Sequence, residues 1–371
     1  MGQSDDVAHG ALDHAELAAL GLRAERLLDF SSNLNPFGPP ASVRAALATL
    51  DPAPYPDRSC HTLRLALAER HHADPAAILP GNGANELIHL LARALLRPGD
   101  AALVIGPTYG EYAHASRLVE ARVVELLALW PEPPATTGAR YAGPPSVEAA
   151  DPQQATRLIA AIEQARPRLT WLCAPNNPTG LTVAPETILA LAEVCAIHGG
   201  YLILDRSYQD LQRPVEPLPQ EVPPPGLIAL YSLTKAYALA GLRLGYLLAA
   251  PALVARVARY QPAWSVSSAA QAAGLAALAD QAFLATTVPQ LWAASDQLSS
   301  GISALELPVW RARLPMLLVR TGDGAATRSA LLKRGCVVRD CASFGLPAWV
   351  RVAPQRPEAN ARLLDAWRAL G

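Results

Sequence analysis

Short apolar runs alternate with longer helical patterns through the middle of the sequence, and this order constrains the fold more than any other feature. Each run is bounded by Gly, Pro or polar residues and has the length of a buried strand: residues 101–106, 169–174, 201–205, 227–232 and 244–249. Helical patterns lie between them, as at 86–96 and 185–198. The order predicts an α/β fold with a mainly parallel sheet covered by helices, whose ligands bind beyond the carboxyl ends of the strands.

The pattern changes after residue 262 to helices with fewer strands, ending in a helical stretch at 357–370. A chain of 371 residues is long enough for two domains with cores of their own, so we expect a second, smaller domain here. Two proline-rich stretches, 130–152 and 213–226, predict exposed excursions that are too short to link domains.

Composition excludes several classes of protein. Hydrophobic residues make up 51% and charged residues 17% of the chain, which is typical of a globular protein. A formal net charge of −1 argues against binding to nucleic acid. The first residues have neither the basic start nor the apolar run of a secretion signal, so we expect a cytoplasmic protein. The one stretch that could be mistaken for a membrane span, 236–255, contains Arg243 and Pro251, which indicates a buried strand with its flanks.

Neither cysteine nor histidine is arranged for a metal site or a disulfide framework. The five cysteines are scattered, odd in number and without a C-x-x-C pair. Of the eight histidines, only His71 and His72 are adjacent, and two neighbouring helix positions do not face one ion comfortably. We therefore expect no bound metal.

Lysine is rare in this chain, because only two of its 31 basic residues are lysines, Lys235 and Lys333. Arginine cannot form a Schiff base at neutral pH, since its guanidinium stays protonated, whereas a lysine in an apolar setting loses its proton readily. Lys235 lies in Y-S-L-T-K, shortly before G-L-R-L-G-Y, and is a candidate covalent anchor. The alternative is an ordinary surface lysine, as we expect Lys333 to be.

Two segments suit a phosphate. Residues 80–86, P-G-N-G-A-N-E, precede a helix, whose free backbone N–H groups and positive dipole end can hold an anion. Ser232, Thr234 and Arg243 surround Lys235 with two hydroxyls and one charge. Each segment alone is weak, because many helices start after a glycine.

Other polar residues follow predicted strands and suit a planar ligand. Tyr109 could place its ring over such a ligand, although a lone tyrosine is more often packed in a core. Asp205 ends a strand and, if it is buried rather than capping a helix, would pair with a protonated ring nitrogen.

Taken in order, N-P-T-G at 177–180, Asp205, the S-x-x-K ending at Lys235 and then Arg243 resemble one superfamily. On these motifs the chain is identified as a member of the fold-type I pyridoxal-phosphate enzymes, the aspartate aminotransferase superfamily. The resemblance implies a three-layer α/β/α large domain with a mainly parallel sheet at residues 41–262, and a smaller α+β domain formed by residues 1–40 and 263–371. It also implies pyridoxal 5'-phosphate as the cofactor.

The same resemblance implies roles for individual residues. Lys235 would be the covalent anchor, and Asp205 would keep the pyridine nitrogen protonated, so that the ring withdraws electrons from the substrate. Asn177 and Tyr208 would bond the phenolic oxygen of the ring, and Tyr109 would stack on it. The phosphate would be bound by Ala84, Asn85, Ser232 and Arg243.

The N-terminal segment resembles one branch of that superfamily, the threonine-phosphate decarboxylases, in H-G at 9–10 and D-F-S-S-N-L-N-P at 29–36. These enzymes convert L-threonine O-3-phosphate to (R)-1-aminopropan-2-yl phosphate for cobalamin biosynthesis, and this reaction is our first expectation. The alternative is a histidinol-phosphate or related amino-acid aminotransferase, because those enzymes share N-P-x-G, Y-P-D and the cofactor motifs.

The resemblance also implies how substrate and subunits meet. Substrate contacts are expected from His9, Asn33, Arg339 and Arg351, since the forked donors of arginine suit carboxylate and phosphate. Tyr55, the tyrosine of Y-P-D, would reach the cofactor phosphate of a neighbouring subunit, which implies a homodimer.

The chain departs from the family pattern in two places. Ala11 stands where the family has the second glycine of H-G-G, which affects a turn. Arg206-Ser207 replaces the usual Glu-Ala after the aspartate and puts a base in place of an acid.

Two further classes are disfavoured. A non-catalytic regulatory module that binds pyridoxal phosphate would not need every catalytic position, and all of them are present. A dinucleotide-dependent reductase would need G-x-G-x-x-G after its first strand, which is missing here.

Overall fold

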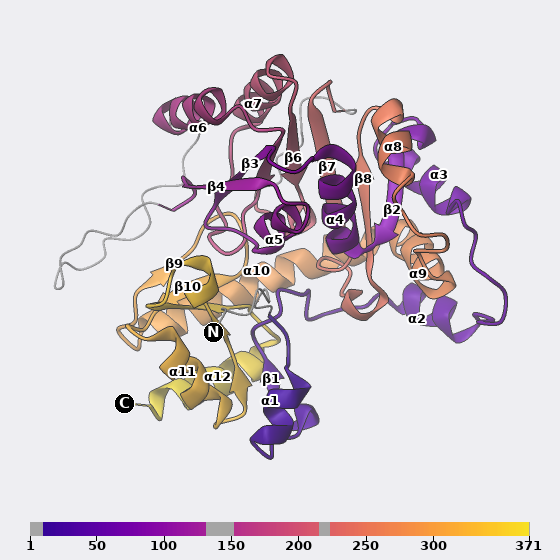
Figure 1. Ribbon diagram of the computed structural model, residues 1–371. Coiled ribbons are helices and arrows are strands. Elements are labelled where there is room, and N and C mark those ends of the chain that lie inside the picture. Colours follow the sequence, from indigo (N-terminus) through magenta and orange to yellow (C-terminus); the bar gives the residue numbers. More distant parts are fainter. Residues whose placement is uncertain (1–9, 131–151, 215–222, 371) are drawn as a thin grey trace.

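The computed structural model describes residues 10–130, 152–214 and 223–370, whose strands form one large and two small sheets (Figure 1). The large sheet has seven strands, in the order β2 (Ile78–Asn82), β8 (Leu244–Leu248), β7 (Leu227–Ser232), β6 (Tyr201–Asp205), β5 (Leu169–Cys173), β3 (Ala101–Gly106) and β4 (Arg122–Leu127). Strands β7, β6, β5, β3 and β4 are parallel, while β8 is antiparallel to β7 and β2. The mainly parallel sheet is therefore confirmed.

The five predicted buried strands are all present, but the apolar pattern does not reveal β2 and β4, which are the two edges of the sheet. β2 contains Pro80 and Gly81, which an edge strand tolerates because one of its sides has no strand to pair with. β4 is exposed along much of its length. Edge strands therefore lack the continuous apolar run by which a central parallel strand is recognised.

Helices cover both faces of the large sheet, because alternate residues of a strand point to opposite faces. On one face, Val104 and Trp171 belong to the core that includes α4 (Gly83–Leu95), α5 (Glu111–Leu118) and α8 (Pro251–Ala258). On the other, Ile105 and Leu172 pack with α6 (Pro152–Ala165) and α7 (Pro185–Ile197). Beside β2 and β8 this second face is covered by α3 (His61–Arg70) and α9 (Ser268–Ala279), with α2 (Ala41–Ala48) against α9.

The small sheets lie beside the layered unit and bring the two ends of the chain together (Figure 1). One sheet has the order β12 (Arg339–Asp340), β13 (Trp349–Val352), β10 (Leu317–Arg320) and β9 (Val309–Trp310); the other pairs β1 (Leu28–Asp29) with β11 (Cys336–Val337). The helices of this unit are α1 (His14–Ala19), α10 (Gln281–Ser303), α11 (Gly324–Leu332) and α12 (Pro357–Arg368). Phe30 shares a core with Leu298 and Val350, so both chain ends contribute to it. The boundaries at residues 41 and 262 stay a prediction.

Within the described residues, no helix is both long and apolar enough to cross a membrane. The stretch 236–255 instead contains η4 (Ala240–Leu242), β8 and the start of α8. All five cysteines are buried and free, and no cluster of metal-binding side chains occurs in the part of the chain that the structure describes. Most of the two predicted excursions, at 131–151 and 215–222, lies outside the described residues.

Candidate active site

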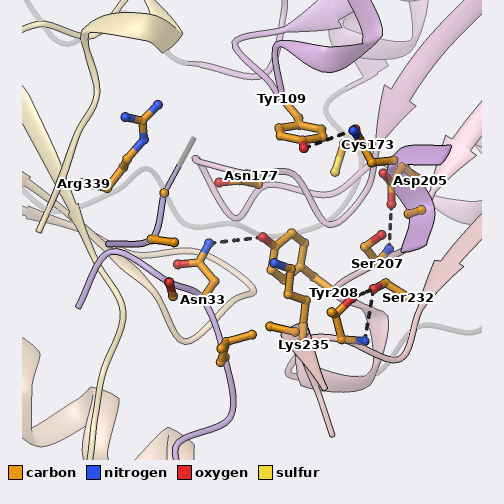
Figure 2. Close-up of a pocket in the computed structure, with 18 of the residues that line it drawn as sticks. Asn33, Tyr109, Cys173, Asn177, Asp205, Ser207, Tyr208, Ser232, Lys235 and Arg339 are labelled. Atoms are coloured by element: carbon orange, nitrogen blue, oxygen red, sulfur yellow. Dashed lines mark hydrogen bonds between the residues drawn. The ribbon is translucent and has the colours of Figure 1, made fainter. Parts of the chain in front are cut away.

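A cavity of about 440 Å³ lies at the carboxyl ends of β5, β6 and β7, where strands of the large and small sheets both contribute to its wall (Figure 2). This is the edge at which parallel sheets place their ligands. Most residues singled out by the sequence line the cavity, namely Asn33, Ala84, Asn85, Tyr109, Asn177, Asp205, Tyr208, Ser232, Lys235, Arg243, Arg339 and Arg351.

Strand alternation brings three side chains to one face. Cys173, Asp205 and Ser232 end β5, β6 and β7 and all line the cavity, on the side of the sheet that α4 and α5 cover. Cys173 lies directly beside Asp205 in the strand register. Arg206, one residue further, is not among the lining residues, as the same alternation requires.

Arg206, which replaces the usual acid, is buried near His71 and Tyr231. Burial, followed by the charges of Arg70 and Arg206, lowers the pKa of His71 to about 4. Arg206 thus puts a positive charge near His71 and Tyr231, away from the cavity. It adds no charge to the residues that line the cavity.

Asp205 is buried and accepts hydrogen bonds through both carboxylate oxygens. The hydroxyl of Tyr112 donates to Oδ2 at 2.7 Å, and the backbone N–H of Ser207 donates to Oδ1 at 2.8 Å. Burial raises the pKa of Tyr112 well above its ordinary value, so this phenol remains a donor. Asp205 is therefore held as a fixed acceptor that can pair with a cationic ring nitrogen.

Lys235 is half-buried and lines the cavity, with its Nζ atom 6.0 Å from the ring centre of Tyr208 (Figure 2). Burial, assisted by the charges of Arg351 and Arg243 and opposed by Asp205, lowers the pKa of this amine to about 8. An amine with such a pKa is available in its neutral, nucleophilic form near neutral pH, which supports the predicted anchoring role.

The N-terminus of α4 and Arg243 form a close-packed anion cradle. A Cβ atom on Gly83, where φ is +77°, would lie 2.5 Å from Nη2 of Arg243, and one on Gly245 would lie 2.6 Å from the backbone nitrogen of Ala84. Glycine at 83 lets the guanidinium approach the first turn of α4, and glycine at 245 lets strand β8 approach it. The N–H groups of this turn have no partner within the helix. The hydroxyls of Ser232 and Thr234 contact each other beside it.

Polar side chains from three segments surround Tyr208. The amide nitrogen of Asn33 donates to the Tyr208 hydroxyl at 3.3 Å (Figure 2). Asn177 accepts a hydrogen bond from Arg351. Tyr109 donates to Asn85 at 3.4 Å. Oδ1 of Asn33 and Nε of Arg351 are buried without a hydrogen-bond partner among the described residues, which is unusual unless a ligand supplies one.

Arg339 and Arg351 stand directly opposite each other on β12 and β13, so both guanidiniums are on one face of the small sheet. Both are buried, and burial lowers the pKa of each; for Arg339 the charge of Arg351 lowers it further. Figure 2 shows Arg339 on the opposite side of the pocket from Asp205. Among the described lining residues Asp205 is the one carboxylate, and it lies away from the arginine side.

Two predicted residues are not placed in this cavity. Tyr55 is 80% exposed and stacks on Trp264 with 4.8 Å between ring centres, so its predicted contact with a second subunit stays a prediction. His9 lies outside the described residues. Ala11 lines the cavity with φ at +105°, a conformation that favours the glycine usual at this position.

Several lining residues escape the sequence reasoning, among them Tyr112, Cys173, Ser207 and Phe344. Tyr112 stands three residues after Tyr109, a spacing that puts both on one side of a helical turn and could have indicated a shared site. Phe344 gives no such signal, because its place depends on a turn between two very short strands.

Comparison with known proteins gives a family match over nearly the whole chain. The model of the family described as "Aminotransferase class I and II" matches residues 25–366. Histidinol-phosphate aminotransferase 2 of Ralstonia nicotianae is 34% identical, covering 93% of this chain and 89% of that protein. Threonine-phosphate decarboxylase of Salmonella typhimurium is 35% identical, covering 97% of this chain and 96% of that protein.

Solved structures show the same architecture. Histidinol-phosphate aminotransferase from Sinorhizobium meliloti, in complex with pyridoxal-5'-phosphate, matches with a TM-score of 0.82 at 22% identity, covering 97% of this chain and 96% of the other. L-threonine-O-3-phosphate decarboxylase from Porphyromonas gingivalis matches with a TM-score of 0.76 at 25% identity, covering 92% and 98%. The predicted fold is thereby confirmed.

Proposed function

Because this chain belongs to the aminotransferase class I and II family, we propose that it binds pyridoxal phosphate and decarboxylates L-threonine O-3-phosphate. The products would be carbon dioxide and (R)-1-aminopropan-2-yl phosphate, which serves cobalamin biosynthesis. The facing pair Arg339 and Arg351 suits a substrate with two anionic groups, a carboxylate and a phosphate. The observation that carries the choice of the decarboxylase is the N-terminal pattern, H-G at 9–10 and D-F-S-S-N-L-N-P at 29–36. The similarity to the Salmonella decarboxylase, which extends almost from end to end of both chains, supports it.

The cavity wall fits the cofactor. The cradle at Gly83 and Arg243 would hold its phosphate, Asp205 would face its ring nitrogen, and the half-buried amine of Lys235 would anchor it. When bound, pyridoxal phosphate supplies an aldehyde that condenses with amines and a conjugated ring that withdraws electrons from the α-carbon of the substrate. Asn177 and Tyr208 line the same cavity and would contact the ring substituents.

The chain's own residues would then perform three tasks. Arg339 and Arg351 bind the anionic groups and hold the substrate in one orientation. Asp205, fixed by Tyr112, keeps a proton on the ring nitrogen. Lys235 delivers a proton to the α-carbon in place of the departing carboxylate, which its pKa of about 8 permits near neutral pH.

The choice between losing carbon dioxide and losing the α-proton depends on which bond stands perpendicular to the cofactor ring. The positions of the two guanidiniums set that orientation, because they bind the carboxylate and the phosphate at separate points. A single anionic contact would leave the substrate free to rotate about it.

Histidinol-phosphate aminotransferase is the second candidate, because several similar proteins have that name. Its co-substrate glutamate also carries two anionic groups, so the arginine pair would serve there as well. In that reaction Lys235 would remove the α-proton instead of replacing a carboxylate.

One experiment separates the two candidates. The purified enzyme, loaded with pyridoxal phosphate, is incubated with L-threonine O-3-phosphate or with L-histidinol phosphate plus 2-oxoglutarate. Release of carbon dioxide with the first mixture supports the decarboxylase. Formation of glutamate with only the second would transfer the assignment to the aminotransferase.

We also propose that the enzyme acts as a homodimer in which Tyr55 reaches the partner's cofactor phosphate. Its exposed ring, stacked on Trp264, is available for such a contact. Mixing an inactive Lys235→Ala variant with a Tyr55→Phe variant should restore part of the activity, because one site in each mixed dimer is then intact. A mixture no more active than its parents would argue against sharing across subunits.

A further inference from the structure

Phe344 lies in the cavity wall beside the two facing arginines. It ends η5 (Ala342–Phe344), the turn through which the chain passes from β12 to β13. The Cζ atom of Arg339 lies 5.5 Å from the centre of the Phe344 ring, and the Cζ atom of Arg351 lies 6.0 Å from it. One aromatic ring is thus within cation–π distance of both guanidiniums.

The ring is held in place by its surroundings. The backbone N–H of Phe344 donates to the carbonyl oxygen of Cys341 at 3.0 Å. The backbone N–H of Cys341 donates to the carbonyl oxygen of Trp349 at 3.1 Å. The Phe344 side chain also packs in an apolar cluster with Trp310 and Trp349. Because the ring is already fixed, it can orient a neighbouring side chain without losing much conformational entropy of its own when a ligand binds.

The adjacent residue contacts one of the same guanidiniums. Oγ of Ser343 accepts a hydrogen bond from Nη2 of Arg339 at 2.7 Å. Two consecutive residues of one turn therefore contact Arg339, one through an aromatic ring and the other through a hydroxyl.

An aromatic ring has an advantage over an acid at this position. Two buried like charges in facing positions repel each other, and the negative face of a ring offsets part of that repulsion. A carboxylate would offset more, but it would occupy the N–H donors and compete with an anionic substrate. The ring accepts none of the N–H donors, so Nε of Arg351, which is buried without a hydrogen-bond partner among the described residues, stays available to a ligand.

We propose that Phe344 is a positioning residue that holds Arg339 and Arg351 in register and thereby sets how tightly the cavity binds a ligand with two anionic groups. This inference rests on the proposed anion-binding role of the two arginines, and it does not depend on which reaction follows.

The test measures binding without turnover. The probe is 3-phosphonopropionate, which carries a carboxylate and a phosphonate but no amine, titrated into the cofactor-loaded enzyme by calorimetry. Phe344→Leu should raise the dissociation constant about fivefold, equivalent to about 1 kcal/mol. Phe344→Tyr, which keeps the ring, should bind within about twofold of the wild type.

A matched control is available in the same chain. The centre of the Phe37 ring lies 5.2 Å from the Cζ atom of the exposed Arg356, and Phe37 does not line the cavity. Phe37→Leu therefore removes the same kind of cation–π contact at a place away from the site. It should leave the dissociation constant unchanged. Phe344→Met, which keeps most of the side-chain volume without a ring, is measured in parallel and should weaken binding as Leu does.

Kinetics supply a second readout. With whichever substrate the enzyme turns over, Phe344→Leu should raise KM about fivefold while kcat stays near that of the wild type, and in an Arg339→Gln background the same change should cost less. Equal binding of the probe by wild type, Phe344→Leu and Phe344→Met would overturn the inference, as would a wild type that does not bind the probe. Failure to turn over either proposed substrate, with the binding difference intact, would overturn only the proposed function.

Discussion

The two sides of the cavity balance their charges differently. On the side formed by the large sheet, which we call the cofactor wall (Asp205, Ser232, Lys235 and Arg243), a carboxylate lies among cations and hydroxyls. On the side formed by β12, η5 and β13, the substrate wall (Arg339, Phe344 and Arg351), two cations face each other beside a neutral ring. In the cofactor wall, opposite charges already lie close together without a ligand. In the substrate wall, an anionic ligand would also reduce the repulsion between the two guanidiniums.

The largest effect is expected in the cofactor wall. Lys235→Ala should lower activity by at least about 10³-fold, because no other amine among the described lining residues can replace it. Reduction with borohydride should then leave no cofactor attached to the protein, as judged by peptide mass. Lys333→Ala is the matched control, since it removes the chain's other, exposed lysine and should leave activity unchanged. A covalent label on any other peptide of the wild type would contradict the assignment.

The substrate wall should trade activity against stability. Arg339→Gln should lower kcat/KM about 10²-fold through the loss of one charged contact, yet raise the free energy of unfolding by about 0.5 kcal/mol, since it relieves the repulsion with Arg351. Steady-state kinetics and urea denaturation in phosphate-free buffer measure the two changes. Arg339→Lys keeps the charge and should show no such gain. A less stable Arg339→Gln variant with unaltered kcat/KM would show that the two walls do not differ in this way.

The lowered pKa of Lys235 gives the cofactor wall a pH dependence. Only the neutral amine reacts with an aldehyde, so cofactor loading of the apoenzyme should accelerate about tenfold per pH unit below pH 8 and level off above it. Stopped-flow absorbance after mixing with pyridoxal phosphate follows this rate. Arg351→Gln removes one of the charges that lower the pKa and should move the plateau to higher pH. A rate that continues to rise steeply to pH 10 would show that the amine is not perturbed.

The same contrast separates what the sequence predicts from what it does not. Asp205 and Ser232 end strands whose apolar runs are visible, and Lys235 comes three residues after the second of these strands. Their convergence at one edge of the sheet is predictable because the carboxyl ends of parallel strands meet there. Arg339 and Arg351 depend on the pairing of β12, a strand of two residues, with β13. No local pattern specifies that register. The resemblance to a family implies that both arginines contact the substrate, but it does not show that they face each other.

Contacts made by helices are equally hidden. The hydrogen bond from Tyr112 to Asp205 depends on how α5 packs over the sheet, which apolar spacing does not define to within one hydrogen bond. The edge strands β2 and β4 are also not predictable from apolar runs. Each has a neighbouring strand on one side only, so its sequence does not need the continuous apolar run of a central strand.

The smallest expected effect concerns the N-terminal segment that joins the substrate side of the cavity. Ala11 has φ at +105°, so Ala11→Gly should stabilise this segment locally by about 1 kcal/mol through relief of backbone strain. Hydrogen exchange of peptides covering residues 10–35 measures the change. Ala18→Gly, at an exposed position inside α1, is the matched control and should have the opposite sign, because glycine weakens a helix interior. Faster exchange in both variants would mean that the turn at Ala11 carries no strain.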